Sequence, residues 1–174
     1  MDIKKIAFLG IYDAEDSIMG VIMVTDPETK PIEFRVTSPI KPTNFQKILY
    51  GNVLNEHILV ELVALPLLNA ISEQPDLILV NDSNFLGANS KLDARVLRVL
   101  TKAQQNGSKS AKVELKSYNS NNEILYLEAP EELEDELPGI SEALNKISEY
   151  RDLLEPFQRL TQACEQVHLK KTKE

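Results

Sequence analysis

The chain has 174 residues and a net charge of −8 at neutral pH, with 43% hydrophobic and 26% charged residues. This composition is that of an ordinary globular protein, and it excludes a chain that is disordered throughout. The negative charge opposes non-specific binding to nucleic acid and to anionic membranes. Most of the excess acid lies in residues 128–174.

Cysteine content and hydropathy indicate where the protein resides. Cys164 is the single cysteine, so no internal disulfide can form, and no spacing of cysteine and histidine suggests structural zinc. No apolar run approaches the ~20 residues of a membrane span. The short apolar stretch at the N-terminus is followed by acidic residues instead of a small-residue cleavage site. We therefore expect a cytoplasmic protein with no membrane partner.

Three strands open the predicted fold, at residues 6–12, 18–25 and 32–38. The first two are apolar runs, and the third alternates apolar and polar residues with the period of a half-buried strand. The loops that join them are short, and the two prolines within 26–31 are typical of a turn. The three strands therefore predict an antiparallel meander.

A long helix is predicted after the proline-containing segment 38–44, with Thr43 or Asn44 as its N-cap. Its apolar residues form a wide stripe as far as Ile71, which predicts burial against the sheet. Pro66 lies inside this stripe and is expected to kink the helix, because proline has no backbone N–H. The apolar run DLILV at 76–80 then predicts a strand that is parallel to an earlier one and covered on both faces.

The next predicted elements are a helix and a hairpin. Apolar spacing predicts an amphipathic helix from about residue 90 to 105. Strands are predicted at 111–118 and 123–129, and NSNN at 119–122 is the turn between them.

The tail of the chain has the spacing of helices. Apolar residues recur at helical intervals from Ile140 onward, and Pro156 divides the tail into two predicted helices. We predict an α/β fold with α+β character, in which the meander, long helix, parallel strand, helix, hairpin and helical tail follow one another. The predicted domains are a core over 1–129 and an acidic linker with a helical segment over 130–174, packed on the core or on a partner.

The order of three strands, a helix and a fourth strand resembles the start of the ribonuclease H-like fold over about residues 5–86. In that family, acids at the ends of the first and fourth strands lie side by side and hold two magnesium ions together with a glutamate from the first helix. The resemblance implies a nuclease that depends on Mg or Mn. Its acids would be Asp13 or Asp16 after the first strand and Asp82 after the fourth, with Asp13 and Asp82 as the metal ligands.

The sequence departs from this family at the first helix. Its first turn has no acid, and Glu56 and Glu61 lie ~12–20 Å farther along at 1.5 Å per residue. Asp82 also has a structural alternative, because aspartate ends strands by accepting hydrogen bonds from nearby backbone amides. Asp13 and Asp16 fit an exposed turn equally well. The metal site is therefore expected to be incomplete, and no catalytic residue is firmly assigned.

Basic residues recur along the predicted helix at 90–105. They have spacings of four, three and four, which would place them on one helix face: Lys91, Arg95, Arg98 and Lys102. Such a face could follow the phosphates of a nucleic acid. It could also be a solvated face opposite the core, or a docking face for the acidic tail.

The preferred function is a non-enzymatic module that binds a protein partner or forms a homodimer through its helical tail. The acidic tail has an apolar seam, and the chain has no complete catalytic constellation, no P-loop and no nucleophile motif. This interpretation requires no cofactor. The alternatives are an Mg- or Mn-dependent, or degenerate, ribonuclease H-like nuclease, and a nucleic-acid-binding protein that uses the basic helix face.

Overall fold

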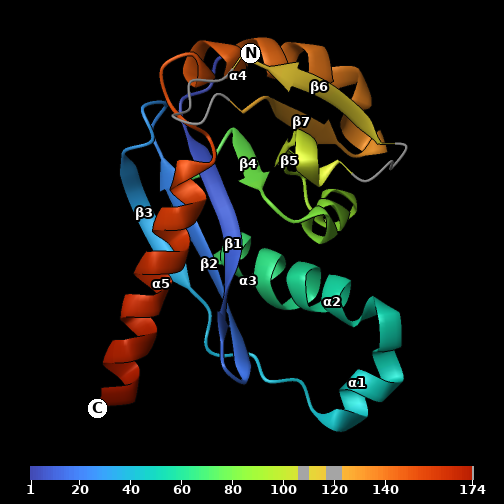
Figure 1. The fold of residues 1–174 in the computed structure, drawn as a ribbon, viewed down its shortest axis with the longest axis vertical. Helices are drawn as coiled ribbons and strands as arrows, with labels where there is room; N and C mark the ends of the chain where they lie inside the picture. Colours follow the sequence, from blue (N-terminus) through green and yellow to red (C-terminus); the bar gives the residue numbers. More distant parts are fainter. Residues whose placement is uncertain (106–109, 117–122, 174) are drawn as a thin grey trace.

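A computed structural model describes residues 1–105, 110–116 and 123–173. Seven strands form one sheet in the order β3-β2-β1-β4-β5-β7-β6, and helices cover both of its faces (Figure 1). The mixed α/β architecture that the sequence predicts is confirmed. The predicted hairpin turn at 119–122 lies outside the described residues.

The first half of the sheet follows the prediction closely. Strands β1 (Ile6–Ala14), β2 (Ser17–Thr25) and β3 (Pro31–Val36) form the antiparallel meander. Strand β4 (Leu77–Val80) then pairs with β1 in parallel, from Ile6 opposite Leu77 to Leu9 opposite Val80. Every residue of β4 is buried, as expected for a strand covered on both faces.

The predicted helix at 90–105 is wrong. The chain forms the 3-10 segment η3 (Ser83–Ser90), the strand β5 (Val96–Thr101) and the short 3-10 turn η4 (Lys102–Gln104). A short apolar run buried on both faces fits either a strand or a helix by periodicity alone. The pairing of β5 with β4 on one side and with β7 on the other decides the outcome.

Two further strands complete the sheet beyond β5. The strands β6 (Ala111–Leu115) and β7 (Leu125–Ala129) pair in antiparallel, which confirms the predicted hairpin pairing.

The long predicted helix is a chain of helical segments over Asn44–Ala70. Its parts are α1 (Asn44–Tyr50), the 3-10 turn η1 (Gly51–Val53), α2 (Leu54–His57), the π-helical η2 (Ile58–Ala64) and α3 (Leu65–Ala70). Thr43 caps the start, as predicted, and a capping box links it to Gln46. The wide π-helical turns directly precede Pro66, whose missing N–H interrupts the α-helical ladder.

The helical run over Asn44–Ala70 departs from the expectation that no apolar stretch of the chain is long enough to span a membrane. By length and composition alone, Asn44–Ala70 could cross a membrane, with a mean hydropathy of 1.4 in its most apolar window and 33% of that window buried. Its second half packs on the sheet through the buried residues of η2 and α3, which include Ile58, Val63 and Leu67. The first half has no buried residue.

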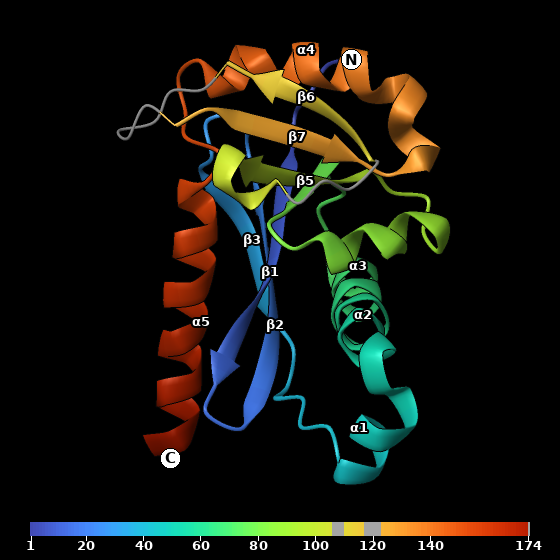
Figure 2. The ribbon, with the colours of Figure 1, turned by 45° about the vertical axis from the view of Figure 1, so that its right-hand side comes forward.

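The C-terminal segment covers the opposite face of the sheet. It comprises η5 (Glu131–Glu136), α4 (Leu137–Ser148) and α5 (Glu155–Lys173). Helix α5 runs along β1 and β2, and α4 lies over β6 (Figure 2). Phe157 meets Phe8 edge to face, with ring centroids 5.5 Å apart. The helical tail therefore packs on its own chain, while the division into two domains stays a prediction.

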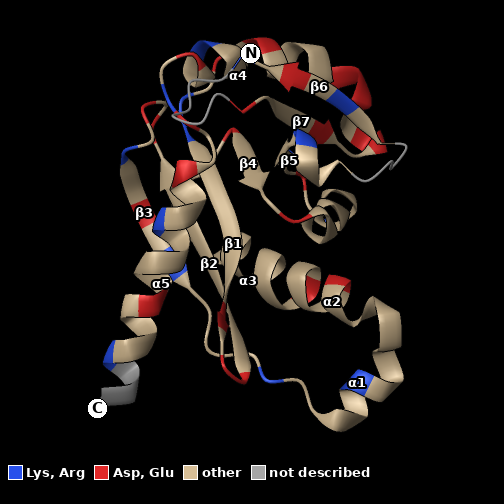
Figure 3. Cartoon of the chain, viewed as in Figure 1, with Lys and Arg blue, Asp and Glu red and all other residues tan. Residues whose placement is uncertain are grey.

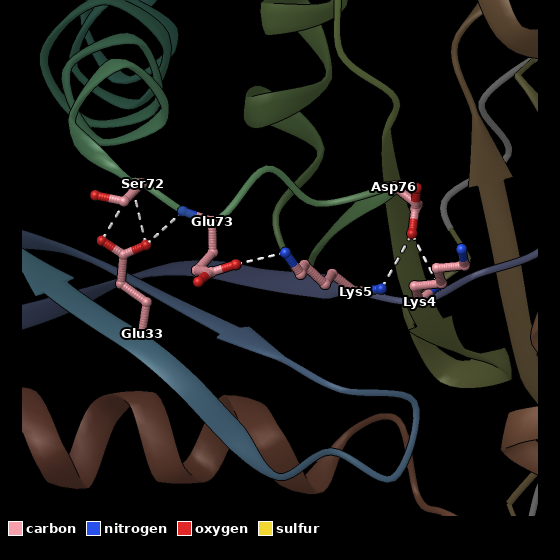
Figure 4. A network of polar contacts seen from close by, with 6 residues as sticks. All are labelled: Lys4, Lys5, Glu33, Ser72, Glu73 and Asp76. Atoms are coloured by element: carbon pink, nitrogen blue, oxygen red, sulfur yellow. Dashed lines mark hydrogen bonds and ion pairs between the residues drawn. The ribbon is translucent and has the colours of Figure 1, made fainter.

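A polar network joins the edge of the sheet to the segment between α3 and β4 (Figure 4). The carboxylate of Glu33 accepts hydrogen bonds from the backbone N–H groups of Ser72 and Glu73, at 2.8–3.1 Å. Glu73 pairs with Lys5, and the carboxylate of Asp76 accepts the backbone N–H groups at the start of the chain. These bonds fix the position of the loop between α3 and β4.

We expect replacement of Gly20 by alanine to destabilise the fold, because β2 and η2 touch there. An added Cβ would lie 2.5 Å from Cγ1 of Val63, a fully buried side chain. The free energy of unfolding, measured by chemical denaturation, should fall by about 1–3 kcal/mol. Gly139→Ala is the control, since its added Cβ meets nothing within 4 Å. Equal stability of the two variants would contradict the close approach.

The free energy of unfolding should fall in acid, in part because Glu33 becomes protonated. Hydrogen bonds from the backbone of Glu73 and from Arg35 lower the pKa of Glu33 below its ordinary value of 4.5. Because the folded state lowers this pKa, the stabilisation is present above the ordinary carboxyl range and is lost as the pH falls through the lowered pKa. Urea unfolding between pH 3 and pH 7 measures this loss.

The Glu33→Gln variant should be less stable than the native chain near neutral pH and approach it in acid. Glu142→Gln, on an exposed position of α4, is the matched control. A constant difference between Glu33→Gln and the native chain at every pH would contradict the role of the charge.

Candidate functional site

The ends of β1 and β4 are the place where ribonuclease H-like proteins bring two acids together. The parallel register reaches Leu9 opposite Val80, and its continuation by one residue brings Gly10 beside Asn81. Neither residue is an acid. A Cβ at Gly10 would point toward Leu160 of α5, at 3.5 Å, so this position faces the C-terminal helix.

Asp82 follows Asn81 and turns the chain into η3. Its carboxylate Oδ1 accepts a hydrogen bond from the backbone N–H of Asn84 at 2.9 Å, and its carbonyl accepts from Phe85 at 3.2 Å. Asp82 is therefore the N-cap of η3. This is the structural role that the sequence also allowed for Asp82, an aspartate that ends a strand by accepting a hydrogen bond from a nearby backbone amide. The catalytic role of Asp82 stays a prediction.

Asp13 and Asp16 lie near the tip of the β1–β2 hairpin, which extends well past the end of β4 (Figure 2). Asp13 pairs with Ile18 in the ladder, and Asp16 bonds to Nζ of Lys41 at 2.7 Å. The hydrogen bond and positive charge of Lys41 lower the pKa of Asp16. Asp13, Asp16 and Lys41 line one hollow of about 440 Å³, and Asp82 is not among its lining residues.

The residues present do not fit a two-metal centre. Within the described parts of the chain, no group of three or more His, Cys, Asp or Glu residues could hold a metal ion. Two hard cations need several oxygen ligands from converging carboxylates. Glu61, an acid on the helical run, bonds instead to Nζ of Lys91. Mg or Mn therefore remains an implication of the family resemblance.

The basic residues that were expected on one helix face lie in different elements. Lys91 and Arg95 are in the loop after η3, Arg98 is in β5, and Lys102 begins η4. Arg95 pairs with Glu136 at 3.0 Å. The predicted basic helix face is therefore wrong, because its four residues lie in a loop, a strand and a 3-10 turn.

Arg98 points into a largely buried charge cluster on the sheet. Its Nη1 lies 3.8 Å from Glu128, and Nζ of Lys112 lies 3.6 Å from the same carboxylate. Nε and Nη1 of Arg98 are buried and have no hydrogen-bond partner within the described structure. A side chain so enclosed is not available to follow nucleic-acid phosphates.

A hollow of about 270 Å³ beside η3 was missed from the sequence. The rings of Tyr50 and His57 stack there, with centroids 4.4 Å apart and planes at 26°. Gly87 and Lys91 complete the wall toward η3, and a Cβ at Gly87 would lie 3.0 Å from Oε1 of Glu56. The signal available in the sequence was the seven-residue spacing of Tyr50 and His57 with a glycine, Gly51, between them. In the structure Gly51 has φ +50°.

Three solved structures share the fold over most of this chain, at low sequence identity. Endonuclease V from Streptomyces avermitilis is 11% identical over 100% of this chain and 86% of its own, with a TM-score of 0.58. Endonuclease V from Ciona intestinalis, in complex with a DNA that contains an inosine followed by a ribo-adenosine, is 17% identical over 98% and 87%, with a TM-score of 0.56. Endonuclease V from Bacillus subtilis is 12% identical over 86% and 71%, with a TM-score of 0.50.

No protein-family model and no curated protein sequence matches the chain. The structural likenesses confirm the ribonuclease H-like fold that the first 86 residues resemble, and they extend it to the whole chain. They also correct the preferred function. The preferred module, which binds a protein partner or forms a homodimer, is corrected in favour of the alternative of an Mg- or Mn-dependent, or degenerate, ribonuclease H-like nuclease, because the chains that share the fold are endonucleases.

The charge cluster of β5, β6 and β7 should be sensitive to loss of its carboxylate. Glu128 is 2% exposed, and replacing it with glutamine removes the carboxylate that lies near the largely buried cations Arg98 and Lys112. We expect the free energy of unfolding to fall by about 3–5 kcal/mol. Denaturant unfolding of Glu128→Gln and of the exposed control Glu131→Gln measures the difference. A loss equal to that of the control would show that the cations do not need Glu128.

Proposed function

We propose that this chain is a ribonuclease H-like nuclease in degenerate form, which binds nucleic acid without a two-metal centre. The whole-chain likeness to endonuclease V structures carries the proposal, since these chains share the fold from end to end. One of them is bound to DNA. The degenerate form follows from the strand ends, where Gly10 and Asn81 occupy the positions at which a metal-binding pair of acids would meet.

The hollow beside η3 is the proposed contact site for a nucleic acid. Aromatic faces accept nucleic-acid bases by stacking, and the Tyr50–His57 pair borders this hollow. Lys91 is half exposed and can reach a phosphate when it leaves Glu61. On one side the hollow is lined by Gly87 and Ser90 of η3, the segment that begins after the cap Asp82.

The net charge of −8 limits the strength of this contact. Few cations are available near the hollow, so a bound nucleic acid would release few counterions. We therefore propose binding of modest affinity in which stacking contributes more than the phosphate contacts. The single Cys164, which forms no internal disulfide, leaves the cytoplasm as the proposed location.

Binding of labelled single-stranded and duplex oligonucleotides, with and without inosine, tests the contact site by fluorescence anisotropy. Tyr50→Ala should raise the dissociation constant about tenfold, because it removes one stacking face. Lys91→Ala should raise it less and should reduce its dependence on salt. Lys146→Ala, on the opposite face in α4, is the control. Equal binding by Tyr50→Ala and the native chain would contradict this site.

The absence of a two-metal centre is tested separately, with Mg²⁺ and Mn²⁺. We expect no cleavage of the bound oligonucleotides with either ion, in the native chain or in Asp82→Asn. Cleavage by the native chain that disappears in Asp82→Asn would contradict the degenerate form and would establish a metal-dependent nuclease. Failure to bind any nucleic acid, in the absence of cleavage, would contradict the proposed function as a whole.

A further inference from the structure

Two acidic residues lie in the middle of the helical run, Glu56 in α2 and Glu61 in η2, and both line the hollow beside η3 (Figure 3). They differ in what engages them. Glu61 pairs with Nζ of Lys91. Among the residues that the structure describes, no hydrogen bond or ion pair engages the carboxylate of Glu56. Its two oxygens can therefore accept hydrogen bonds from a ligand in the hollow.

The carboxylate of Glu56 lies against η3. Segment α2 packs on η3, and a Cβ at Gly87 would stand 3.0 Å from Oε1 and 3.9 Å from Cδ of Glu56. The glycine thus leaves room for the carboxylate beside the η3 backbone. The hydroxyl of Ser90 donates to the carbonyl of Gly87 at 2.9 Å on the same side of the hollow. A ligand that enters the hollow would meet the Glu56 carboxylate at this wall.

The ring pair of Tyr50 and His57 provides stacking in the proposed contact site, but it does not choose between bases. Every base has a π-face, so stacking on such a pair tolerates all of them. The choice depends on the few polar groups that line the site. Glu56 is the acid of this wall that no described cation neutralises, so its carboxylate is the group that can select a base.

A carboxylate accepts hydrogen bonds and donates none, and this property distinguishes the bases. Guanine has two adjacent donors on its Watson–Crick edge, N1–H and N2–H, which match the two carboxylate oxygens as a bidentate pair. Hypoxanthine, the base of inosine, keeps only N1–H. Adenine and cytosine place a ring-nitrogen lone pair beside their amino group, and that lone pair would face the second oxygen and repel it. A carboxylate at this wall therefore favours guanine.

We propose that Glu56 makes the contact site selective for an unpaired guanine in a single strand. The inference rests on the proposed function, because the same hollow and the same ring pair hold the base. In a duplex, pairing with cytosine occupies N1–H and N2–H of guanine, so only an unpaired guanine can offer both donors. These two groups donate to Oε1 and Oε2 of Glu56 while the base stacks at the Tyr50–His57 pair.

Fluorescence anisotropy with labelled single strands tests the selectivity. Each probe is a strand of abasic spacers with one central base, which is guanine, hypoxanthine, adenine or cytosine. The native chain should bind the guanine probe about tenfold more tightly than the adenine probe, with the hypoxanthine probe between them. Glu56→Gln should remove this preference, because its amide presents one donor and one acceptor, the pattern that suits adenine.

Glu61→Gln is the matched comparison, because it removes an equal charge from the same wall. It should change the affinity for every probe by a common factor and keep the ratio of guanine to adenine binding. The ratio separates recognition of the base from the general gain in affinity that follows loss of a negative charge. Circular dichroism verifies that both variants are folded.

The outcomes separate this inference from the proposed function. Equal binding of all the probes by the native chain would overturn the selectivity and leave the contact site in place. A guanine preference that survives in Glu56→Gln, or that is lost in Glu61→Gln, would overturn the assignment to Glu56. A native chain that binds none of the probes, nor the oligonucleotides used for the contact site, would overturn the proposed function and this inference together.

Discussion

The parallel pairing of β1 with β4 is the contact on which the rest of the molecule depends. Both strands lie in the middle of the sheet, and their paired residues are almost completely enclosed, from Ile6 and Leu77 to Leu9 and Val80. The pairing joins the N-terminal meander to the strands β5, β7 and β6 of the second half. Its register also determines which residues meet at the strand ends, where this fold has its chemistry. A shift by one residue would exchange the sides on which these apolar residues lie, so the register is strongly constrained.

In the proposed degenerate form, the register would keep the endonuclease-like fold where the acids of a two-metal centre are missing. The paired apolar residues of β1 and β4 end at Leu9 and Val80, and Gly10 and Asn81 follow them. In the proposed degenerate form, Gly10 and Asn81 occupy the positions where two acids would meet. Asp82 keeps a carboxylate one residue farther on, but the backbone N–H of Asn84 engages it. Fold and site respond to different residues, even though these residues are neighbours along the same two strands.

Strands, caps and the C-terminal helices were predictable because each has a strong local signal. The alternation of β3, the cap at Thr43 and the helical spacing around Pro156 all led to the observed elements. Strand β5 was not predictable from its own residues, because apolar spacing at Val96–Thr101 satisfies a helix as well as a strand. Only its neighbours β4 and β7 distinguish the two.

The candidate site was harder to predict for the same reason. Asp82 was correctly located at the end of a strand, but its hydrogen bond to Asn84 depends on the path of η3. Whether Asp13 lies level with Asp82 depends on how far the β1–β2 hairpin overhangs β4, which no local pattern records. The stacking of Tyr50 on His57 likewise requires the helix break at Gly51.

The outer strand β3 carries features that guard an open sheet edge against polymerisation. Pro31 begins the strand without a backbone N–H, and the register with β2 shifts between Val24 and Thr25. Glu33 and Arg35 add charge to the same strand. Prolines, bulges and charges of this kind prevent an edge from pairing with the edge of another sheet. The protein can therefore expose apolar side chains beside this edge while avoiding the indefinite strand-to-strand growth of aggregates.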